Sequence, residues 1–403
     1  MARINFVVPP IDEFKFTGGL LCIFEYANGL SELGHEVVVT PLYPSPHPKW
    51  FKPKFSIANP QTSSMKNSLL GVAKSLLDYS RSKDKNKVRA AVNNLLTHFT
   101  RYSGYSLRKG GYQQLFSGST QKRDFDVVVA TSFETAFVAS AYYEANKIYF
   151  IQHYEPYFSV DLDDPWGAKI DAELSYFLDM NIVANSSWLA GTLKSKHNID
   201  VFGVNPNAID FEVFHPERSR TSDEFVVISY GGRLATWKGF KEAAEAIRIV
   251  RQTIPDLKWQ VFGDALLPPD NDVAPYEALG FISGGTLRKA YSNADVCLCP
   301  SWYESFPLYP LEAMACGAVV VTTPFGTEDY ATDGHNALFV PPKDSQAMAD
   351  AIIRLYHDRK LLSQMRENGL KSSKEFTWTH AIRNMDQKIK AILHMDQAVD
   401  AVL

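Results

Sequence analysis

Short apolar runs alternate with amphipathic helical segments along most of the chain, which is typical of parallel α/β domains. We predict a helix at Leu20–Leu33, preceded by a loop with Gly18 and Gly19. Helical periodicity at about Met65–Tyr102 interrupts the alternation and indicates an insertion. The strands predicted in this first half are Ile4–Val8, Glu36–Thr40, Asp126–Ala130, Ile148–Gln152 and Asn181–Ala184.

The second half repeats the pattern. Helices are predicted at Phe240–Thr253, at Ser345–Asp358 and from about His380 onward. The strands predicted here are Phe225–Tyr230, Lys258–Phe262, Val296–Pro300, Ala318–Thr322 and Ala337–Phe339. The two halves therefore predict two Rossmann-like, doubly wound domains, with a ligand crevice at the carboxyl ends of the strands.

The length of 403 residues is too great for one ordinary core. We expect an N-terminal domain at 1–205, with an insertion at about 45–123 and joined by the C-terminal helix at about 385–403. A C-terminal domain is expected at 206–384. Between them, Pro and Gly residues at about 203–222 indicate a linker.

Composition narrows the class of protein. Hydrophobic residues make up 45% and charged residues 21%, which excludes a wholly disordered chain. No apolar run approaches the ~18 residues of a membrane span. The four cysteines show no metal-site spacing, so we expect buried free thiols and a cytoplasmic protein.

The charge is unevenly distributed. Residues 45–123 contain fifteen Lys or Arg and two acids, a balance of +13, while the rest of the chain carries −17. This basic insert indicates an anionic partner, or else a solvated helical insertion. Its basic residues are mostly not interleaved with aromatic ones, so no nucleic acid is expected as a partner.

The segment Pro300–Gly317 carries the strongest chemical signal. A short helix is predicted to begin near Tyr309, and its first amides, which lack partners inside the helix, would attract an anion. Glu304 and Glu312 flank this point and can accept hydrogen bonds from hydroxyl groups. A phosphate attached to a polyhydroxylated group would suit both features.

The segment Gly231–Phe240 follows the first strand of the second half. Gly232 would let the backbone approach a ligand closely, and Arg233 and Lys238 project beyond the strand end. Two cations beside a helix start would stabilise a diphosphate, increasingly so as charge grows during bond cleavage. The alternative is that both form ordinary surface ion pairs.

ESFPLYPLEAMACG together with GGR…WKG resembles glycosyltransferase family 4, the retaining nucleotide-sugar transferases of GT-B architecture. TTPFGTEDYATDGHNALFVPP, VANSSWLAGTLK and VNPNAIDFEVFHP are similar to further segments of that family. The resemblance covers almost all of Phe225–Arg354 and patches of the first half, but not the basic insert. The chain departs from the family at Ser305 and Pro307, where the family often has glycine.

The resemblance implies that the domain at 1–205 binds the acceptor and the domain at 206–384 binds the nucleotide-sugar donor. It also implies roles for matching residues. Arg233 and Lys238 would hold the donor diphosphate. Glu312 would bind the ribose, and Glu304 would contact the transferred sugar. The implied catalytic residues are Arg233, Lys238, Glu304 and His153. The implied donor-binding residues, several acting through the backbone, are Gly18, Gly19, Gly232, Arg233, Lys238, Phe281, Ile282, Glu304, Phe306, Leu308, Tyr309 and Glu312. Acceptor contacts are expected for Tyr154 and Glu155.

The resulting hypothesis is transfer of a sugar from a nucleoside-diphosphate sugar to a hydroxyl of a glycan or lipid-linked saccharide, with retained configuration and same-face attack. No metal or other cofactor is expected. The basic insert predicts docking on the anionic inner face of the cell membrane, and we favour a role in bacterial cell-surface polysaccharide synthesis. Two alternatives stay open: a nucleotide-sugar epimerase of similar fold, and a non-catalytic nucleotide-sugar-binding protein.

Overall fold

The computed structural model describes residues 1–59, 125–140, 142, 145–158, 165–217, 224–232, 235–263 and 273–400. The helix predicted at Met65–Tyr102, most of the basic insert and Arg233 lie outside these ranges. The chain divides into two compact units. The first comprises Met1–Ala184, Ile199–Val204 and Ile382–Leu403, and the second Asn185–Asn198 and Asn205–Ala381. The segment 185–198, which we had assigned to the first domain, thus belongs to the second unit.

The first unit is built on a parallel sheet. Its described strands have the order β3-β2-β1-β4-β5-β6-β7, and every neighbouring pair is parallel. The inner strands β1, β4 and β5 are mostly apolar and mostly buried, as expected for strands covered on both faces. Its strands are β1 (Arg3–Val8), β2 (Glu36–Pro41), β3 (Ser56–Ile57), β4 (Val127–Ala130), β5 (Asn146–Ile151), β6 (Asn181–Ala184) and β7 (Gly203–Val204).

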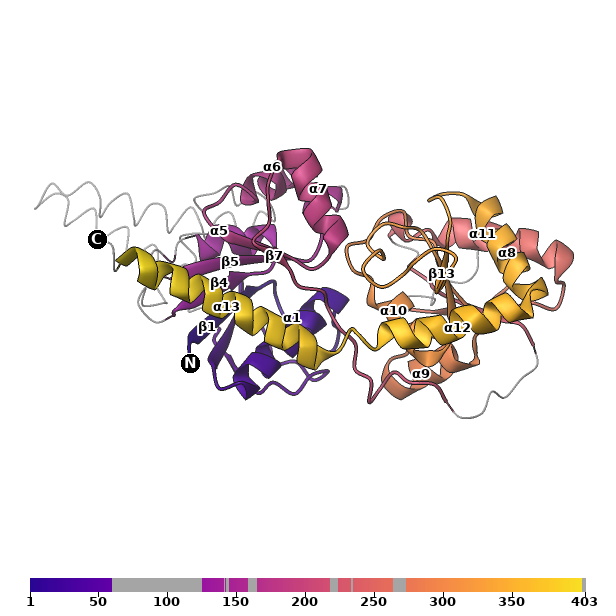
Figure 1. Ribbon diagram of the computed structural model, residues 1–403, viewed down its shortest axis with the longest axis horizontal. Helices are drawn as coiled ribbons and strands as arrows, with labels where there is room; N and C mark the ends of the chain where they lie inside the picture. Colours follow the sequence, from indigo (N-terminus) through magenta and orange to yellow (C-terminus); the bar gives the residue numbers. More distant parts are fainter. Residues whose placement is uncertain are drawn as a thin grey trace, which may run out of the picture. The chain divides into compact units, whose positions relative to one another are not determined.

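The described helices of this unit include one from the far end of the chain. Helix α13 lies along α1 (Figure 1). The Ile382 side chain of α13 fills the space beside Gly29 of α1. The buried His35 ring accepts from the Ala2 N–H at Nδ1 (3.1 Å) and therefore donates from Nε2 to Asp386 of α13 (2.9 Å). The elements are α1 (Gly18–Glu32), α5 (Phe133–Ala139), the 3-10 turn η1 (Glu155–Tyr157), α6 (Pro165–Ser175) and α13 (Trp378–Asp400).

The second unit has a parallel sheet of described strands in the order β10-β9-β8-β11-β12-β13. These are β8 (Val226–Tyr230), β9 (Lys258–Phe262), β10 (Glu277–Gly280), β11 (Val296–Cys299), β12 (Val319–Thr322) and β13 (Ala337–Phe339). The accompanying helices are α7 (Ser187–His197), η3 (Thr236–Lys238), α8 (Phe240–Thr253), α9 (Gly284–Asn293), α10 (Leu308–Cys316), α11 (Ser345–His357) and α12 (Arg359–Ser373).

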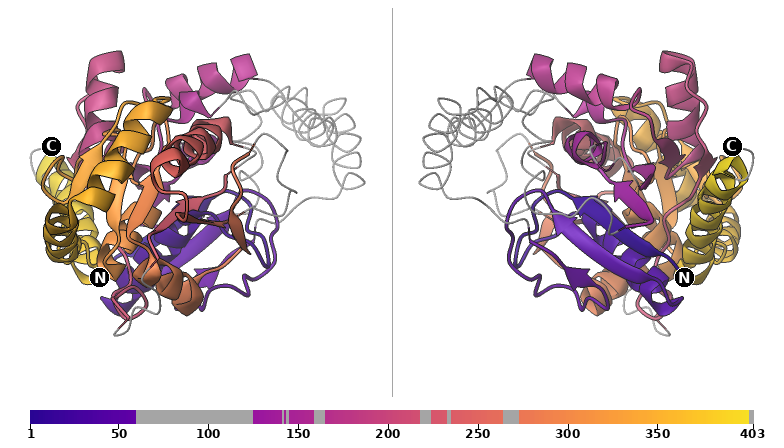
Figure 2. Two further views of the ribbon diagram at one scale, coloured as in Figure 1. Left: turned by 90° about the vertical axis from the view of Figure 1, so that its right-hand side faces the viewer. Right: turned by 90° about the vertical axis from the view of Figure 1, so that its left-hand side faces the viewer.

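Alternate residues of these strands face two separate apolar cores. In β11, Val296 and Leu298 join the core under α8 and α11, whereas Cys297 and Cys299 join the core under α9 and α10. Helices cover both faces of the sheet (Figure 2). Because β8 and β11 are parallel neighbours, the loops that follow them emerge at the same edge, and these loops carry Lys238 and Glu304.

Candidate active site

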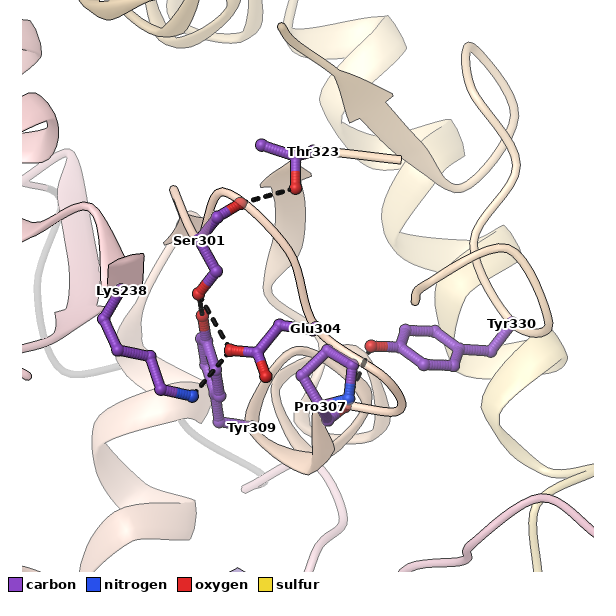
Figure 3. Close-up of polar contacts among 7 residues, drawn as sticks. All are labelled: Lys238, Ser301, Glu304, Pro307, Tyr309, Thr323 and Tyr330. Atoms are coloured by element: carbon purple, nitrogen blue, oxygen red, sulfur yellow. Dashed lines mark hydrogen bonds and ion pairs between the residues drawn. The ribbon is translucent and has the colours of Figure 1, made fainter. Parts of the chain in front are cut away.

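An ion pair lies at the carboxyl edge of the second sheet. Lys238, the last residue of η3, places its Nζ 2.6 Å from Oε1 of Glu304, in the loop after β11 (Figure 3). Glu304 is only 5% exposed, and its Oε1 also accepts a 2.9 Å hydrogen bond from Ser301 Oγ. The pair is therefore largely shielded from water, unlike the surface ion pair that was the alternative for Lys238. Removing one partner would leave a buried charge uncompensated.

Aromatic rings surround the Lys238 ammonium. Its Nζ lies 4.2 Å from the ring centre of Trp237, 5.8 Å from that of Tyr309 and 5.9 Å from that of Tyr230. The Tyr309 hydroxyl is 3.2 Å from Ser301 Oγ (Figure 3), and burial raises the pKa of Tyr309 well above its usual value. Because these groups are largely buried, the local dielectric constant is low and each electrostatic interaction among them is stronger than in water.

The start of α10 offers an anion-binding end. The helix begins at Leu308, close to the predicted start, and Pro307 before it provides no side-chain cap. The Leu308 and Tyr309 N–H groups therefore have no partner inside the helix and none from a capping side chain. Tyr330 Oη donates to the Pro307 carbonyl oxygen (2.9 Å), which fixes the loop at this point (Figure 3). Such a helix end attracts a phosphate group.

Two glycines allow the site loops to approach one another. Gly239 has φ +71°, and a Cβ there would overlap the Pro300 carbonyl oxygen. Gly326 has φ +81°, and a Cβ there would overlap the Glu304 carbonyl oxygen. Larger residues at either position would be strained and would push the loops apart. A Cβ at Gly232 would lie 2.7 Å from Tyr230 Cε1 and 3.0 Å from Lys238 Cγ, so a side chain there would displace the lysine stem.

Glu312 lies one helical turn beyond Tyr309, so the two share one side of α10. Its Oε2 accepts a 3.4 Å hydrogen bond from Tyr291 Oη on α9. Burial raises the pKa of Glu312 to about 7, and the tyrosine bond only partly offsets this effect. A neutral or weakly charged carboxyl at this position can both donate to and accept from a ribose hydroxyl.

The remaining donor-site predictions in this unit fall into two environments. Phe281 and Ile282 lie between β10 and α9: Phe281 is 64% exposed, while Ile282 packs against the core under α9 and α10. The Phe306 side chain is buried against Tyr330 and Phe376, with ring centres 5.3 and 5.8 Å away. Phe306 could therefore contact a donor only through its backbone, as the resemblance implies.

In the first unit, Gly18 and Gly19 form the start of α1, which is capped by Thr17. Gln152 Nε2 donates to the Gly19 carbonyl oxygen (3.1 Å), linking this turn to the end of β5. His153 follows immediately, and its ring packs edge-on against Phe158, with ring centres 4.8 Å apart. The structure thus brings the glycine turn and the segment carrying His153 to the same edge of the first sheet.

The two residues expected to touch the acceptor make contacts inside the first unit. Glu155 accepts from the Phe133 N–H (2.6 Å) and from Tyr149 Oη (3.2 Å). Burial, followed by the nearby Glu134, raises the pKa of Glu155 to about 8. Tyr154 is buried, its ring packs on Tyr157, and burial raises its pKa to about 12. An acceptor role for either residue remains a prediction.

Sequence analysis missed three side chains that shape the site. Ser301 bonds the Glu304 carboxylate, Tyr291 bonds Glu312, and Trp237 packs under the Lys238 ammonium. The position of Ser301 just after a strand was the one available signal, because strand ends are where ligands bind in such sheets.

The described residues contain neither a cluster of metal-binding side chains nor a membrane-spanning helix. No group of three or more His, Cys, Asp or Glu side chains in that part of the chain could hold a metal ion. Within the same residues, no helix has the length and apolar character needed to span a membrane.

Comparison with known proteins agrees with this architecture. Residues 226–358, which lie in the second unit, match the family model of the Glycosyl transferases group 1. A D-inositol 3-phosphate glycosyltransferase of Paenarthrobacter aurescens is 30% identical over 220 residues, 49% of this chain and 54% of that protein. Another, from Stackebrandtia nassauensis, is 27% identical over 247 residues, 55% of this chain and 56% of that protein. The chain spans about half the length of the curated relatives it matches.

Solved structures show the fold over nearly the whole chain. A sucrose-phosphate synthase from Thermosynechococcus elongatus has a TM-score of 0.69 at 16% identity, covering 98% of this chain and 100% of that one. Anabaena HepE in complex with UDP-glucose has a TM-score of 0.67 at 17% identity, covering 97% and 100%. The two Rossmann-like units thus form the GT-B fold predicted from the sequence.

Proposed function

We propose that the protein is a retaining glycosyltransferase that moves a sugar from a nucleoside-diphosphate sugar to a hydroxyl of a glycan or glycolipid acceptor. The observation that carries this proposal is the Lys238–Glu304 pair beside the start of α10. It gathers a cation, a hydrogen-bond acceptor and two uncapped amides at one sheet edge, and a sugar diphosphate needs all three.

The proposed chemistry uses these groups in sequence. The donor diphosphate takes over the Lys238 ammonium from Glu304, and its terminal phosphate meets the Leu308 and Tyr309 amides. Glu304 can then accept hydrogen bonds from the sugar hydroxyls. As the glycosidic bond breaks, negative charge grows on the diphosphate, and the fixed lysine and amides stabilise it. The departing phosphate oxygen takes the proton of the acceptor hydroxyl, which attacks from the same face.

The donor nucleotide and the pathway belong to the same proposal. UDP-glucose in the Anabaena structure supports a UDP-sugar as the first donor to test. A Myxococcus xanthus relative named O-antigen biosynthesis protein RfbC, 28% identical over 228 residues, supports a role in cell-surface polysaccharide synthesis. We expect the reaction to require no metal. The basic insert, most of which lies outside the described residues, is proposed to bind the anionic inner membrane face.

The decisive experiment substitutes each residue of the Lys238–Glu304 ion pair in turn and measures donor turnover. Lys238→Ala and Glu304→Gln are expected to lower donor turnover about 100-fold or more, because each removes a group that acts in the transition state. Lys241→Ala, three residues further on and exposed, is the matched control. Undiminished donor turnover in both site variants would refute the proposal. The anomeric configuration of the product, read by NMR, tests retention.

Membrane docking has its own test. Each basic residue near an anionic surface contributes about 1 kcal/mol, so a cluster with a +13 balance suffices without a spanning helix. We expect the protein to co-sediment with vesicles containing phosphatidylglycerol at low salt and to be released at high salt. Absence of sedimentation at both salt concentrations would contradict docking.

A further inference from the structure

Trp237, the residue before Lys238, contacts the Lys238 ammonium. The Trp237 indole ring has the Lys238 Nζ 4.2 Å from its centre. The Tyr303 ring is stacked on the same indole, with ring centres 5.6 Å apart and planes within 9° of parallel. Since Tyr303 directly precedes Glu304, one tryptophan contacts both segments that form the ion pair.

The backbone ties the same two segments together. The Trp302 N–H donates to the Trp237 carbonyl oxygen at 2.8 Å. Trp237 is thus anchored to the Glu304 loop by its carbonyl and by its ring. The position of Trp237, and with it that of the Lys238 side chain, therefore depends on the position of the Glu304 loop, which would receive the donor sugar.

We propose that Trp237 is a positioning residue that holds the Lys238 ammonium in place for the donor diphosphate; this inference rests on the proposed function. A lysine ammonium is strongly hydrated and sits on a flexible four-carbon stem. When the diphosphate enters, Glu304 must give up this ammonium to serve the sugar. The attraction of the indole face does not use the ammonium's N–H donors, so Trp237 can keep holding the cation while those donors turn to phosphate.

The chain contains a matched control pair. Trp302 has the Lys343 Nζ 3.8 Å from its ring centre, and its Nε1 donates to Glu242 Oε1 at 3.1 Å. This is the same lysine-on-indole contact one residue from Tyr303, but it holds a different lysine. A Trp302→Leu change therefore removes a lysine–indole contact, and the hydrogen bond to Glu242, without touching Lys238.

The experiment measures UDP binding by calorimetry and UDP release from UDP-glucose for Trp237→Leu, Trp237→Phe, Trp302→Leu, Lys238→Met and the double variant of Trp237→Leu with Lys238→Met. We expect Trp237→Leu to raise the Kd for UDP about tenfold and to lower turnover, as for a desolvated cation–π contact. Trp237→Phe keeps an aromatic ring beside the ammonium, so its Kd for UDP and its turnover should be close to those of the wild type. Trp302→Leu should behave as the wild type.

The double variant separates positioning from general packing. Without the ammonium, the Trp237→Leu change should add less than twofold to the effect of Lys238→Met. The inference is overturned if Trp237→Leu has the Kd for UDP and the turnover of the wild type, or if Trp237→Phe binds UDP no more tightly than Trp237→Leu. It is also overturned if Trp237→Leu raises the Kd by the same factor in the presence and in the absence of Lys238. If the wild type binds none of UDP, dTDP, GDP and ADP, or Lys238→Met alters neither readout, the proposed function fails and this inference fails with it.

Discussion

Replacing Glu312 with glutamine tests the electrostatics of the second unit directly. Burial raises the pKa of this carboxyl from 4.5 to about 7. A carboxyl with a raised pKa in the folded state binds its proton more tightly there than in the unfolded chain, so the folded state loses stability as the pH rises. The difference between the two pKa values corresponds to about 3 kcal/mol at 1.36 kcal/mol per pKa unit. The loss begins near pH 4.5 and is complete above pH 7.

Glutamine at this position cannot ionise but can still bond Tyr291. We expect Glu312→Gln to be more stable than the wild type by up to about 3 kcal/mol at pH 8.5, and close to it at pH 4.5. Urea unfolding at pH values from 4.5 to 9, followed by fluorescence, gives the difference at each pH. A constant difference across this range would refute the reasoning, because it would show that Glu312 does not titrate differently in the folded protein.

Three glycine substitutions test backbone packing. Gly326→Ala should lower the free energy of unfolding by more than about 2 kcal/mol and weaken UDP binding, because the new Cβ overlaps the Glu304 carbonyl. Gly334 also has a positive φ, +70°, but open space around it. Gly334→Ala should therefore lower the free energy of unfolding by only about 1 kcal/mol in the same denaturation assay. Gly29→Ala should loosen α13 because its Cβ meets Ile382, and adding Ile382→Ala should recover part of the lost thermal stability. Equal losses for both loop variants, or no recovery in the double variant, would contradict these packing arguments.

Helices with a clear apolar period, and short apolar runs bounded by turn residues, could be predicted closely. The bounds of β6, β9, β13 and α8 are those expected from the sequence. Elements with neither feature were missed. Helix α5 has seven residues, too few to establish a helical repeat, and the edge strand β3 has only two, Ser56–Ile57. Contacts with neighbouring elements, not sequence pattern, decide elements of this kind.

Some features of the candidate site could likewise be predicted from the sequence, and others could not. Lys238, Glu304 and Tyr309 could be grouped from the sequence, because strand ends and a helix start identify one sheet edge. The sequence could not show that Lys238 pairs with Glu304, or that Trp237 packs beneath the ammonium. Those contacts depend on which loops the strand order brings together, and on the close approach that Gly239 and Gly326 permit.

The return of α13 to the first unit bears on how the chain folds as it is made. On the ribosome, β1 to β7 emerge early, but Ile382 and Asp386, which cover Gly29 and His35, emerge only after the whole second unit. At about 5–20 residues per second, the delay between Val204 and Ile382 is roughly 10 to 35 s. Throughout that time the surface around Gly29 and His35 lacks the cover that α13 later provides. The first unit is therefore completed only after the second has been made, and a chain that stops before α13 keeps this surface exposed.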